Sequence, residues 1–171
     1  MALNAVVART VQLVYLMAPA YVANMAPPFT RFWPGWNRPI SERWLGSHKT
    51  VLGAAAGVAT SVIVAFVQAR IAWTGSIADY SRWLPLGVLL GAGAMGGDAL
   101  KSFFKRRRGI PAGARWVPAD QLDFALGALI LVRIMVPLSW VDAAVTLALT
   151  FVGDIVVNQL AFRLRVRETA W

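Results

Sequence analysis

The residues best suited to chemistry lie in one short segment, residues 96–124, which reads GGDALKSFFKRRRGIPAGARWVPADQLDF. One aspartate ends an apolar run, a block of basic residues follows, and two further aspartates precede the next apolar run. Carboxylates are good ligands for Mg²⁺, and lysine and arginine neutralise the phosphate oxygens that the ion leaves uncovered. The segment therefore suits a magnesium-bound polyphosphate, and phosphoryl or nucleotidyl transfer depends mainly on such positioning and charge stabilisation.

The spacing of the charges predicts polar stripes on helices. Four polar residues follow one another at i, i+3, i+4 and i+7, namely Asp98, Lys101, Ser102 and Lys105. They share one helix face if the helix continues beyond the glycines that precede them. In a later apolar segment Asp154 and Asn158 share a face at i and i+4. An aspartate within a membrane costs about 2.5–3.5 kcal/mol, so such residues need a charged partner or a water-filled cavity.

The composition excludes several other kinds of site. Cysteine is absent and His48 is the only histidine, so the chain can form no disulfide, thiolate nucleophile or site of Cys and His ligands. Any metal must be held by oxygen. The net charge of +9 could indicate nucleic acid in a soluble chain. Here the charges lie between apolar blocks, so membrane topology explains them and no nucleic-acid partner is expected.

Membrane-spanning helices must position these residues. Hydrophobic residues make up 58% of the 171, above the roughly 45–50% of soluble domains. Five apolar segments are candidates for the about 20 residues that a bilayer crossing needs, namely residues 5–24, 51–73, 83–97, 122–138 and 141–162. The sequence thus predicts an all-α, polytopic membrane protein with five transmembrane helices in a single domain, residues 1–171. Residues 18–20 resemble a signal cleavage site, but we expect the first segment to be retained because it is long enough to span.

Basic residues predict the orientation, because lysine and arginine concentrate in cytoplasmic loops. The loops after the first and third segments and the C-terminal tail hold Arg31, Arg38, Arg43, Lys49, Lys101, Lys105, Arg106, Arg107, Arg108, Arg115, Arg163, Arg165 and Arg167. The opposite side holds only Arg9, Arg70 and Arg82. We therefore expect the N-terminus outside, the C-terminus inside and two long cytoplasmic loops.

With this topology, polar residues from all five segments collect at the cytoplasmic end. They are Asn24, Lys49, Thr50, Asp98, Lys101, Asp120, Asp123, Asp154 and Asn158. Simpler roles exist for each of them: the basic block could be a topology signal or a contact for anionic lipid, and Asp120 with Asp123 could cap a helix. Neither role requires aspartates and all three lysines at one depth. Their joint occurrence predicts a polar cavity that opens to the cytoplasm.

Arg133 lies apart from this cluster. It is about six residues from the turn near Ser139 and Asp154 is about fifteen, so their backbones differ in depth by some 13 Å. A direct pair is not expected. We expect Arg133 to extend outward toward Asp142.

Several motifs resemble those of the archaeal CDP-archaeol synthases, which are CTP-dependent cytidylyltransferases of ether-lipid biosynthesis. They are GDALKSFFKRRRGIPAG, PADQLDF, YVANMAPP, LGSHKT and NQLAFRL. The resemblance spans nearly the whole chain and is most specific over residues 97–124. The first loop departs from the family pattern, because it reads NRPISERW where acidic residues and glycines usually precede LG-x-x-KT.

The resemblance implies that the phosphate of an unsaturated isoprenoid-ether glycerol phosphate attacks the α-phosphorus of CTP. It implies Mg²⁺ at Asp98, Asp120 and Asp123, and stabilisation of the leaving pyrophosphate by Lys101, Lys105 and Arg106. Six residues would line the nucleotide or lipid-phosphate pocket: Asn24, Lys49, Thr50, Ser102, Gln121 and Asn158. We also expect lipid tails to enter between helices, where the glycines of the third segment would permit wide packing.

Two other classes of protein remain open. A CDP-alcohol phosphotransferase would also bind a CDP-lipid with Mg²⁺, but its D-G-x-x-A-R pattern is missing, since the chain contains no Asp-Gly dipeptide. A small cation transporter could use Asp98 and Asp154 as ligands. It would need a polar path to the outer face, where the helices offer little beyond Arg9, Arg70 and Arg133.

Overall fold

The computed structural model describes residues 2–111 and 114–163, and this part of the chain is helical without a β-strand. Five helices of more than ten residues dominate it: α1 (Ala2–Met25), α3 (Val51–Ile71), α4 (Trp83–Arg107), α5 (Ala119–Val132) and α6 (Trp140–Arg163). Short elements fill the connections: η1 (Pro27–Phe32), η2 (Pro34–Trp36), α2 (Glu42–Leu45) and η3 (Tyr80–Arg82). Arg165 and Arg167, which contributed to the predicted orientation, lie outside the described residues.

Four helices, α1, α3, α4 and α6, are long and apolar enough to cross a membrane. The prediction of an all-helical, multi-pass membrane protein is therefore confirmed. α5 falls short of the expected segment 122–138, because its 14 residues rise about 21 Å against a bilayer core of about 30 Å. Pro137 prevents the helix from continuing to the end of that segment, since it lacks the N–H that would bond to the carbonyl of Arg133.

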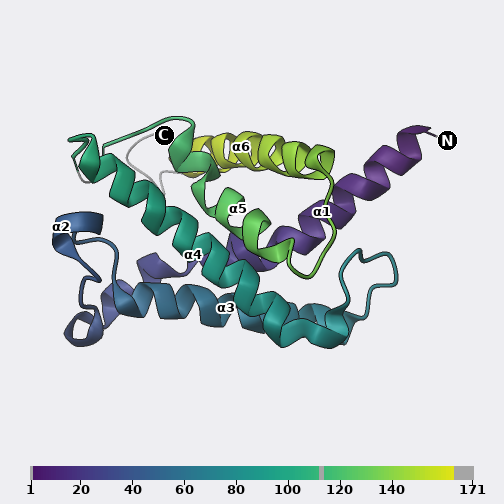
Figure 1. The fold of residues 1–171 in the computed structure, drawn as a ribbon, viewed down its shortest axis with the longest axis horizontal. Helices are drawn as coiled ribbons and strands as arrows, with labels where there is room; N and C mark the ends of the chain where they lie inside the picture. The colour runs from purple at the N-terminus through teal and green to yellow at the C-terminus, as the bar shows by residue number, and fades with distance from the viewer. Residues whose placement is uncertain (1, 112–113, 164–171) are drawn as a thin grey trace.

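α4 is longer than the predicted segment 83–97 and runs on to Arg107. The charges that end the apolar run do not end the helix, because lysine and arginine are good helix formers. Asp98, Lys101 and Lys105 consequently lie on one continuous helix. Figure 1 shows α4 running from the α3–α4 connection to the end near α2, where α5 begins and α6 ends.

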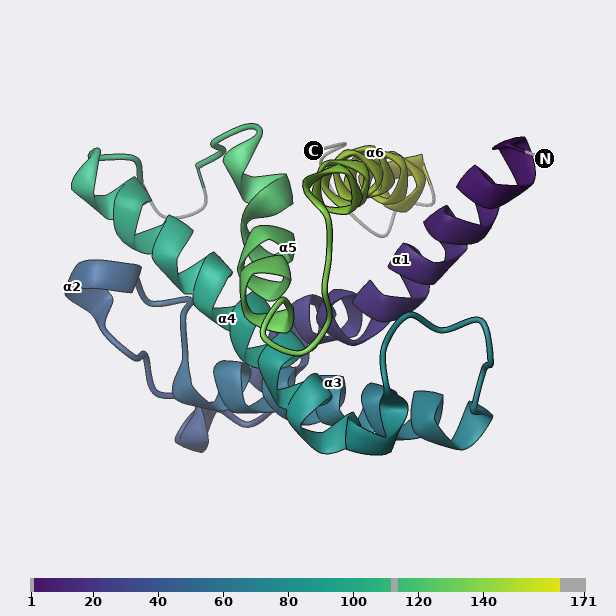
Figure 2. The ribbon, with the colours of Figure 1, turned by 45° about the vertical axis from the view of Figure 1, so that its right-hand side comes forward.

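Glycines let α4 approach both neighbouring helices. Gly91 meets α3, where an added Cβ would lie 2.9 Å from the Cα of Val58. Gly97 meets α5, where a Cβ would clash with the carbonyl oxygen of Asp123, and Gly127 of α5 comes similarly close to Gly93. Figure 2 shows α4 between α3 and α5. The expectation that these glycines permit wide packing is therefore wrong, because they close the helix contacts instead.

A buried apolar cluster joins α1, α4 and α5. It contains Leu13, Leu16, Met17, Ala20, Ala23, Leu86, Leu90, Ala94, Phe124, Ala125, Ala128, Leu129 and Val132. The cluster fixes the mutual positions of the helices whose ends carry the charged residues.

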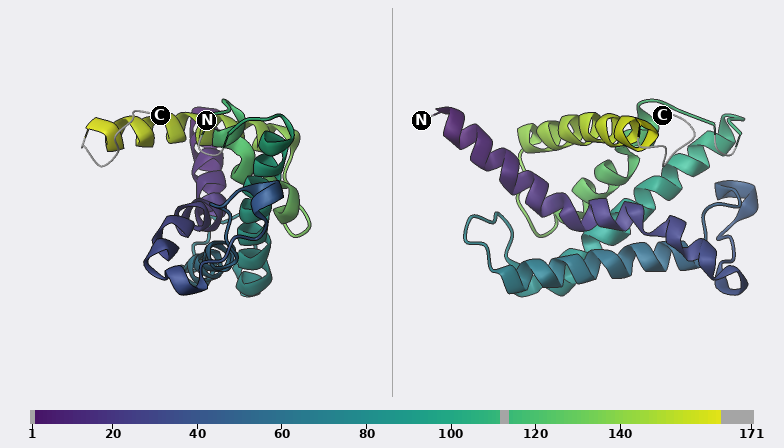
Figure 3. Two further views of the ribbon diagram at one scale, coloured as in Figure 1. Left: turned by 90° about the vertical axis from the view of Figure 1, so that its left-hand side faces the viewer. Right: turned by 180° about the vertical axis from the view of Figure 1, so that it is seen from behind.

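α6 is held mainly through its first half. Arg9 of α1 donates two hydrogen bonds to Asp142, at 2.8 and 2.7 Å, and the hydroxyl of Tyr21 lies 2.9 Å from that of Thr150. Beyond these contacts α6 projects from the side of the bundle (Figure 3). The expected approach of Arg133 to Asp142 is wrong, since α1 supplies the partner, and Arg133 lies over the ring of Trp140 at 4.5 Å.

Candidate functional site

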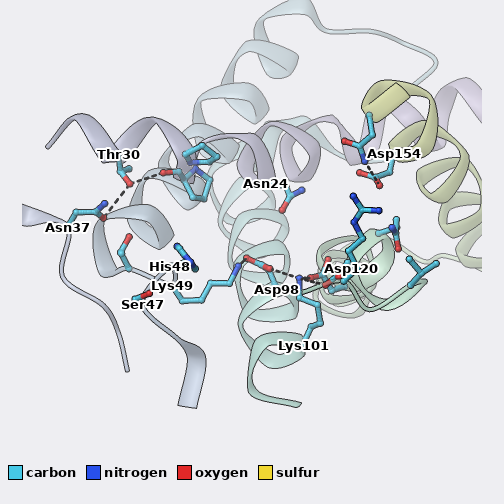
Figure 4. A pocket seen from close by; sticks show the side chains of 18 residues that line it. Asn24, Thr30, Asn37, Ser47, His48, Lys49, Asp98, Lys101, Asp120 and Asp154 are labelled. Atoms are coloured by element: carbon cyan, nitrogen blue, oxygen red, sulfur yellow. Dashed lines mark hydrogen bonds and ion pairs between the residues drawn. The ribbon is translucent and has the colours of Figure 1, made fainter. Parts of the chain in front are cut away.

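A polar cavity of about 700 Å³ lies where the ends of α1, α3, α4 and α5 and the second half of α6 meet (Figure 4). Nine of the predicted site residues line it: Asn24, Lys49, Thr50, Asp98, Lys101, Asp120, Gln121, Asp123 and Asn158. Ser102, Lys105 and Arg106 are not among its described lining residues. Charged residues from α4, α5 and the first loop are thus brought together at one end of the helices.

Lys101 is the centre of the charge network. Its ammonium nitrogen lies 3.1 Å from an oxygen of Asp98, 3.1 Å from Asp120 and 2.7 Å from Asp123. Because one nitrogen contacts all three, any two of these oxygens lie within about 6 Å of each other. The side chains of Lys101 and Asp123 are only 15% and 5% exposed. The close packing of Gly97 against Asp123 makes this convergence possible, since it brings α4 and α5 into backbone contact.

Lys49 brings the first loop to the same network. Its ammonium group donates to Asp98. The backbone on either side is fixed, because Ile40 donates to the carbonyl of Lys49 at 2.8 Å and Val51 donates to that of Arg38 at 3.0 Å. The hydroxyl of Thr50 accepts from the N–H of Gly53 and so caps α3. The loop therefore holds Lys49 at a defined place beside α4.

Lys105 positions the connection between α4 and α5. Its ammonium group lies 3.0 and 3.1 Å from the two oxygens of Asp120 and also donates to the carbonyl of Ala114. The N–H of Trp116 donates to Asp120 at 2.6 Å. Asp120, in the first turn of α5, thus contacts the loop that precedes this helix as well as two lysines. Ser102 is buried and donates to the carbonyl of Asp98 at 2.9 Å, within its own helix.

Several residues that line the cavity were not predicted as site residues from the sequence. Thr30, Asn37, Ser47 and His48 come from the first loop, and Arg115 comes from the connection before α5. These residues carry no helical periodicity, so their spacing gave no signal. Asp154, whose role was left open, lines the cavity and accepts a hydrogen bond from Asn158 at 2.9 Å. The helical spacing of that pair, with its depth in the expected topology, had predicted that the two would lie together in the polar cluster.

The carboxylate oxygens of the cavity suit a hard cation whose coordination is completed by phosphate oxygens. Within residues 2–111 and 114–163, no three His, Cys, Asp or Glu side chains form a ready metal cage. Mg²⁺ does not need such a cage, because it is usually bound by one or two carboxylates together with waters and substrate phosphates. Asp98 and Asp123 are at hand for that purpose, and the Lys101 ammonium shows that a cation is accommodated between them.

Fold and cavity together define a class: a multi-pass, α-helical membrane protein with a charged site at the ends of its helices. A solved structure of the same architecture is described as an intramembrane enzyme for archaeal membrane lipids biosynthesis. It shares 28% sequence identity, with a TM-score of 0.62 over 85% of this chain and 91% of that chain.

The family model of the CarS-like CDP-archaeol synthases matches residues 6–171. The CDP-archaeol synthase of Methanospirillum hungatei is 32% identical over 171 residues, covering 91% of this chain and all of the relative. That of Halorubrum lacusprofundi is 36% identical over 92% of this chain and 94% of its own length. The chain belongs to the CDP-archaeol synthase family.

Proposed function

We propose that the protein, a membrane-bound CTP-dependent cytidylyltransferase, transfers CMP from CTP to 2,3-bis-O-geranylgeranylglyceryl phosphate, an unsaturated ether-lipid phosphate. The products are CDP-archaeol and pyrophosphate. Membership of the family supports the reaction. The observation that carries the site assignment is the meeting of three aspartates and three lysines in and beside one cavity.

In the reaction, an oxygen of the lipid phosphate forms a bond to the α-phosphorus of CTP. The bond from that phosphorus to the oxygen bridging the α- and β-phosphates breaks, and its electron pair leaves with pyrophosphate. Both reactants are anionic, so the site must reduce their repulsion and stabilise the charge that develops on the leaving group. Lys49 and Lys101 line the cavity and are placed to do so.

The lysines and aspartates neutralise one another in the network, which has three of each. A triphosphate brings several further negative charges into the cavity. We infer an exchange of partners, in which Lys49 and Lys101 turn to phosphate oxygens and the carboxylates that they release face a cation. Lysine suits such an exchange, because its ammonium is a compact charge on a flexible stem.

Magnesium is the cation that we assign. Asp98, Asp120 and Asp123 would hold it jointly with the triphosphate, and it would neutralise phosphate charge in the transition state. Asp120 is the least free of the three, since it already accepts from Lys105 and from the N–H of Trp116. We therefore expect Asp98 and Asp123 to make the principal contacts.

We infer that the cavity faces the cytoplasm, where CTP is found, and that the N-terminus lies outside. The excess of basic residues at the cavity end supports this orientation. We also infer that α5 acts as the fifth span. Residues 133–138 would complete its crossing, and its contacts with α1, α4 and α6 place it within the bundle.

The reaction is tested with purified protein, radiolabelled CTP and the ether-lipid phosphate in detergent or vesicles. Labelled CDP-lipid and pyrophosphate should form in equal amounts. Asp98→Asn, Asp120→Asn and Asp123→Asn should each reduce turnover severely, whereas Asp79→Asn, at an exposed site in the α3–α4 connection, should not. Near-normal turnover in all three site variants would end the carboxylate assignment. Transport of cations without any CDP-lipid would favour the transporter.

A further inference from the structure

The first loop makes a second contact with α4, through α2. Residues 40–49 form an excursion that is closed at its base by a hydrogen bond of 2.8 Å from the N–H of Ile40 to the carbonyl oxygen of Lys49. α2 lies within this excursion and packs against α4 (Figure 1). It begins in the stretch NRPISERW, where the loop departs from the family pattern. The departing stretch therefore has a defined place beside the site.

Trp44 joins α2 to α4. Its ring centroid lies 5.7 Å from that of Phe103, with 37° between the ring planes. The guanidinium carbons of Arg43 on α2 and Arg107 on α4 lie 4.9 and 5.0 Å from the centroid of the same ring. Neighbouring aromatic rings attract one another, and a cation is attracted to a ring face. We call these four side chains the Trp44 stack.

The backbone presents Trp44 to α4 in a fixed way. The hydroxyl of Ser41 accepts a hydrogen bond from the N–H of Trp44 at 3.4 Å and so caps α2. Gly46 ends the helix with a φ of 85°, which a glycine adopts without strain. A helix of one turn is not stable alone, so it depends on contacts with the rest of the protein. The position of the loop therefore depends on the Trp44 stack.

The loop touches α4 at two places. Lys49 donates to Asp98. Trp44 lies against Phe103, which is five residues and about 7.5 Å further along the helix. Trp44 is not among the described residues that line the polar cavity, so it can act on the reaction only by placing the loop. When Lys49 exchanges Asp98 for a phosphate oxygen, the loop loses its ion pair with α4, whereas the Trp44 stack remains.

We propose that Trp44 is a positioning residue, which holds the first loop against α4 so that Lys49 can pass from Asp98 to the triphosphate of CTP. This inference rests on the proposed function. The contact between the rings of Trp44 and Phe103 is its main part. Arg43 and Arg107 are exposed, and a cation over a ring contributes little at an exposed site. The loss of one arginine should therefore leave the loop in place.

The dissociation constant of CTP, measured by calorimetry with Mg²⁺ in detergent, tests the proposal. Lys49→Ala should weaken CTP binding by about tenfold or more, because a hydrogen bond from a charged group is lost. Trp44→Ala should weaken it by at least about threefold, and the double variant should bind CTP no more weakly than Lys49→Ala, because Trp44 acts through Lys49. Trp44→Phe should keep most of the affinity, since a phenyl ring can still stack on Phe103.

Trp140→Ala is the matched control. Trp140 is also an exposed tryptophan beside an arginine, since Arg133 lies 4.5 Å from its ring centroid. It stands at the start of α6, away from the cavity, so its loss should leave the dissociation constant of CTP at the wild-type value.

The position of the loop can be followed directly, because the chain has no cysteine. Glu42→Cys on α2 and Leu84→Cys on α4 are exposed positions for nitroxide labels. Leu84 lies about 28 Å before Phe103 along the helix, a separation suited to double electron–electron resonance. The label distance should be narrowly distributed with Trp44 or Trp44→Phe and broad in Trp44→Ala. Phe103→Ala should broaden it equally and replaces Trp44→Ala if that variant does not fold.

Wild-type affinity for CTP in both Trp44→Ala and Phe103→Ala would overturn the proposal, as would a label distance that neither variant broadens. It would also fail if the effects of Trp44→Ala and Lys49→Ala on CTP binding multiply in the double variant. If the wild-type protein binds no CTP and forms no CDP-lipid, the proposed function fails and this inference fails with it, whatever the label distances show.

Discussion

At the scale of single residues, Lys101 contacts more carboxylates than any other described residue of the site. It contacts Asp98, Asp120 and Asp123 at once and is largely shielded from solvent. Three carboxylates so close together repel one another unless a cation lies between them. Lys101 therefore has two tasks: it holds the carboxylates together before CTP binds, and in the proposed reaction it turns to phosphate.

Lys101→Ala should lower kcat/KM by about 10²–10³-fold, equivalent to about 2.7–4 kcal/mol of transition-state stabilisation. The loss follows because an electrostatic donor disappears from the reacting centre. Steady-state kinetics with CTP and lipid phosphate would measure it. Arg107→Ala is the control, since that side chain lies on the same helix but packs over Trp44 and Phe103. If Lys101→Ala keeps the wild-type kcat/KM, as we expect of Arg107→Ala, Lys101 does not stabilise the transition state.

The site residues that could be predicted are those whose polar side chain is out of place in an apolar segment. Asp98, Asp123 and Asn158 belong to this group, and all three line the cavity. Thr30 and Asn37 could not be predicted, because polar residues are ordinary in a loop and only tertiary structure turns them inward. Arg133 was assigned to Asp142 by proximity in sequence, whereas Arg9 reaches that carboxylate across the bundle.

At the scale of secondary structure, the contact between α4 and α5 builds the site. Gly93 and Gly97 on α4 and Gly127 on α5 bring the two backbones together, as small residues do between membrane helices. This contact places Asp98 and Lys101 opposite Asp120 and Asp123. The apolar runs of α4 and α5 predicted two helices but not their distance, which depends on which face each glycine occupies.

Gly97→Ala should destabilise the protein by about 1–3 kcal/mol or more, because its Cβ would clash with the backbone of α5 at Asp123. Turnover should fall with it. Gly96→Ala is the matched control, since a Cβ there meets nothing within 4 Å. Thermal unfolding in detergent and CDP-lipid formation would be measured for both. An unchanged Tm and activity in Gly97→Ala would contradict the close contact.

The pair between Arg9 and Asp142 fastens α6 to α1 at the end away from the cavity. Removing one partner leaves the other charge unpaired, whereas removing both does not. The losses of unfolding free energy in Arg9→Ala and Asp142→Ala should therefore add up to more than the loss in the double variant. We expect a difference of about 0.5–3 kcal/mol in this double-mutant cycle. The dissociation constant of CTP should hardly change. Strict additivity of the two unfolding free energies would contradict the pair.

At the scale of the whole molecule, the two ends differ in chemistry. The cavity, the lysines and the first loop lie at one end, and the α3–α4 connection lies at the other (Figure 1). The apolar segments predicted α1, α3 and α6 closely, because length and hydrophobicity are local properties, whereas α4 runs on through charged residues beyond its predicted end. The early end of α5 could not be predicted from hydrophobicity, because the apolar run continues to Leu138, past the last residue of the helix, Val132.

The orientation can be measured directly, since the chain has no cysteine to interfere. Ser47→Cys lies at the cavity and Thr74→Cys in the α3–α4 connection, and both positions are exposed. In right-side-out vesicles, a membrane-impermeant maleimide should label Thr74→Cys, while Ser47→Cys should react only in inverted vesicles. The reverse pattern would place the cavity outside and contradict the proposed use of cytoplasmic CTP.

We propose above all that carboxylates from α4 and α5 hold one divalent ion together with CTP. Binding of Mn²⁺, followed by electron paramagnetic resonance with and without CTP, tests it most directly. The wild-type protein and Asp79→Asn should show a tight Mn²⁺ site that requires CTP, and Asp98→Asn and Asp123→Asn should weaken that site by at least about tenfold. If both site variants bind Mn²⁺ and CTP as tightly as the wild-type protein, the carboxylates do not hold the ion.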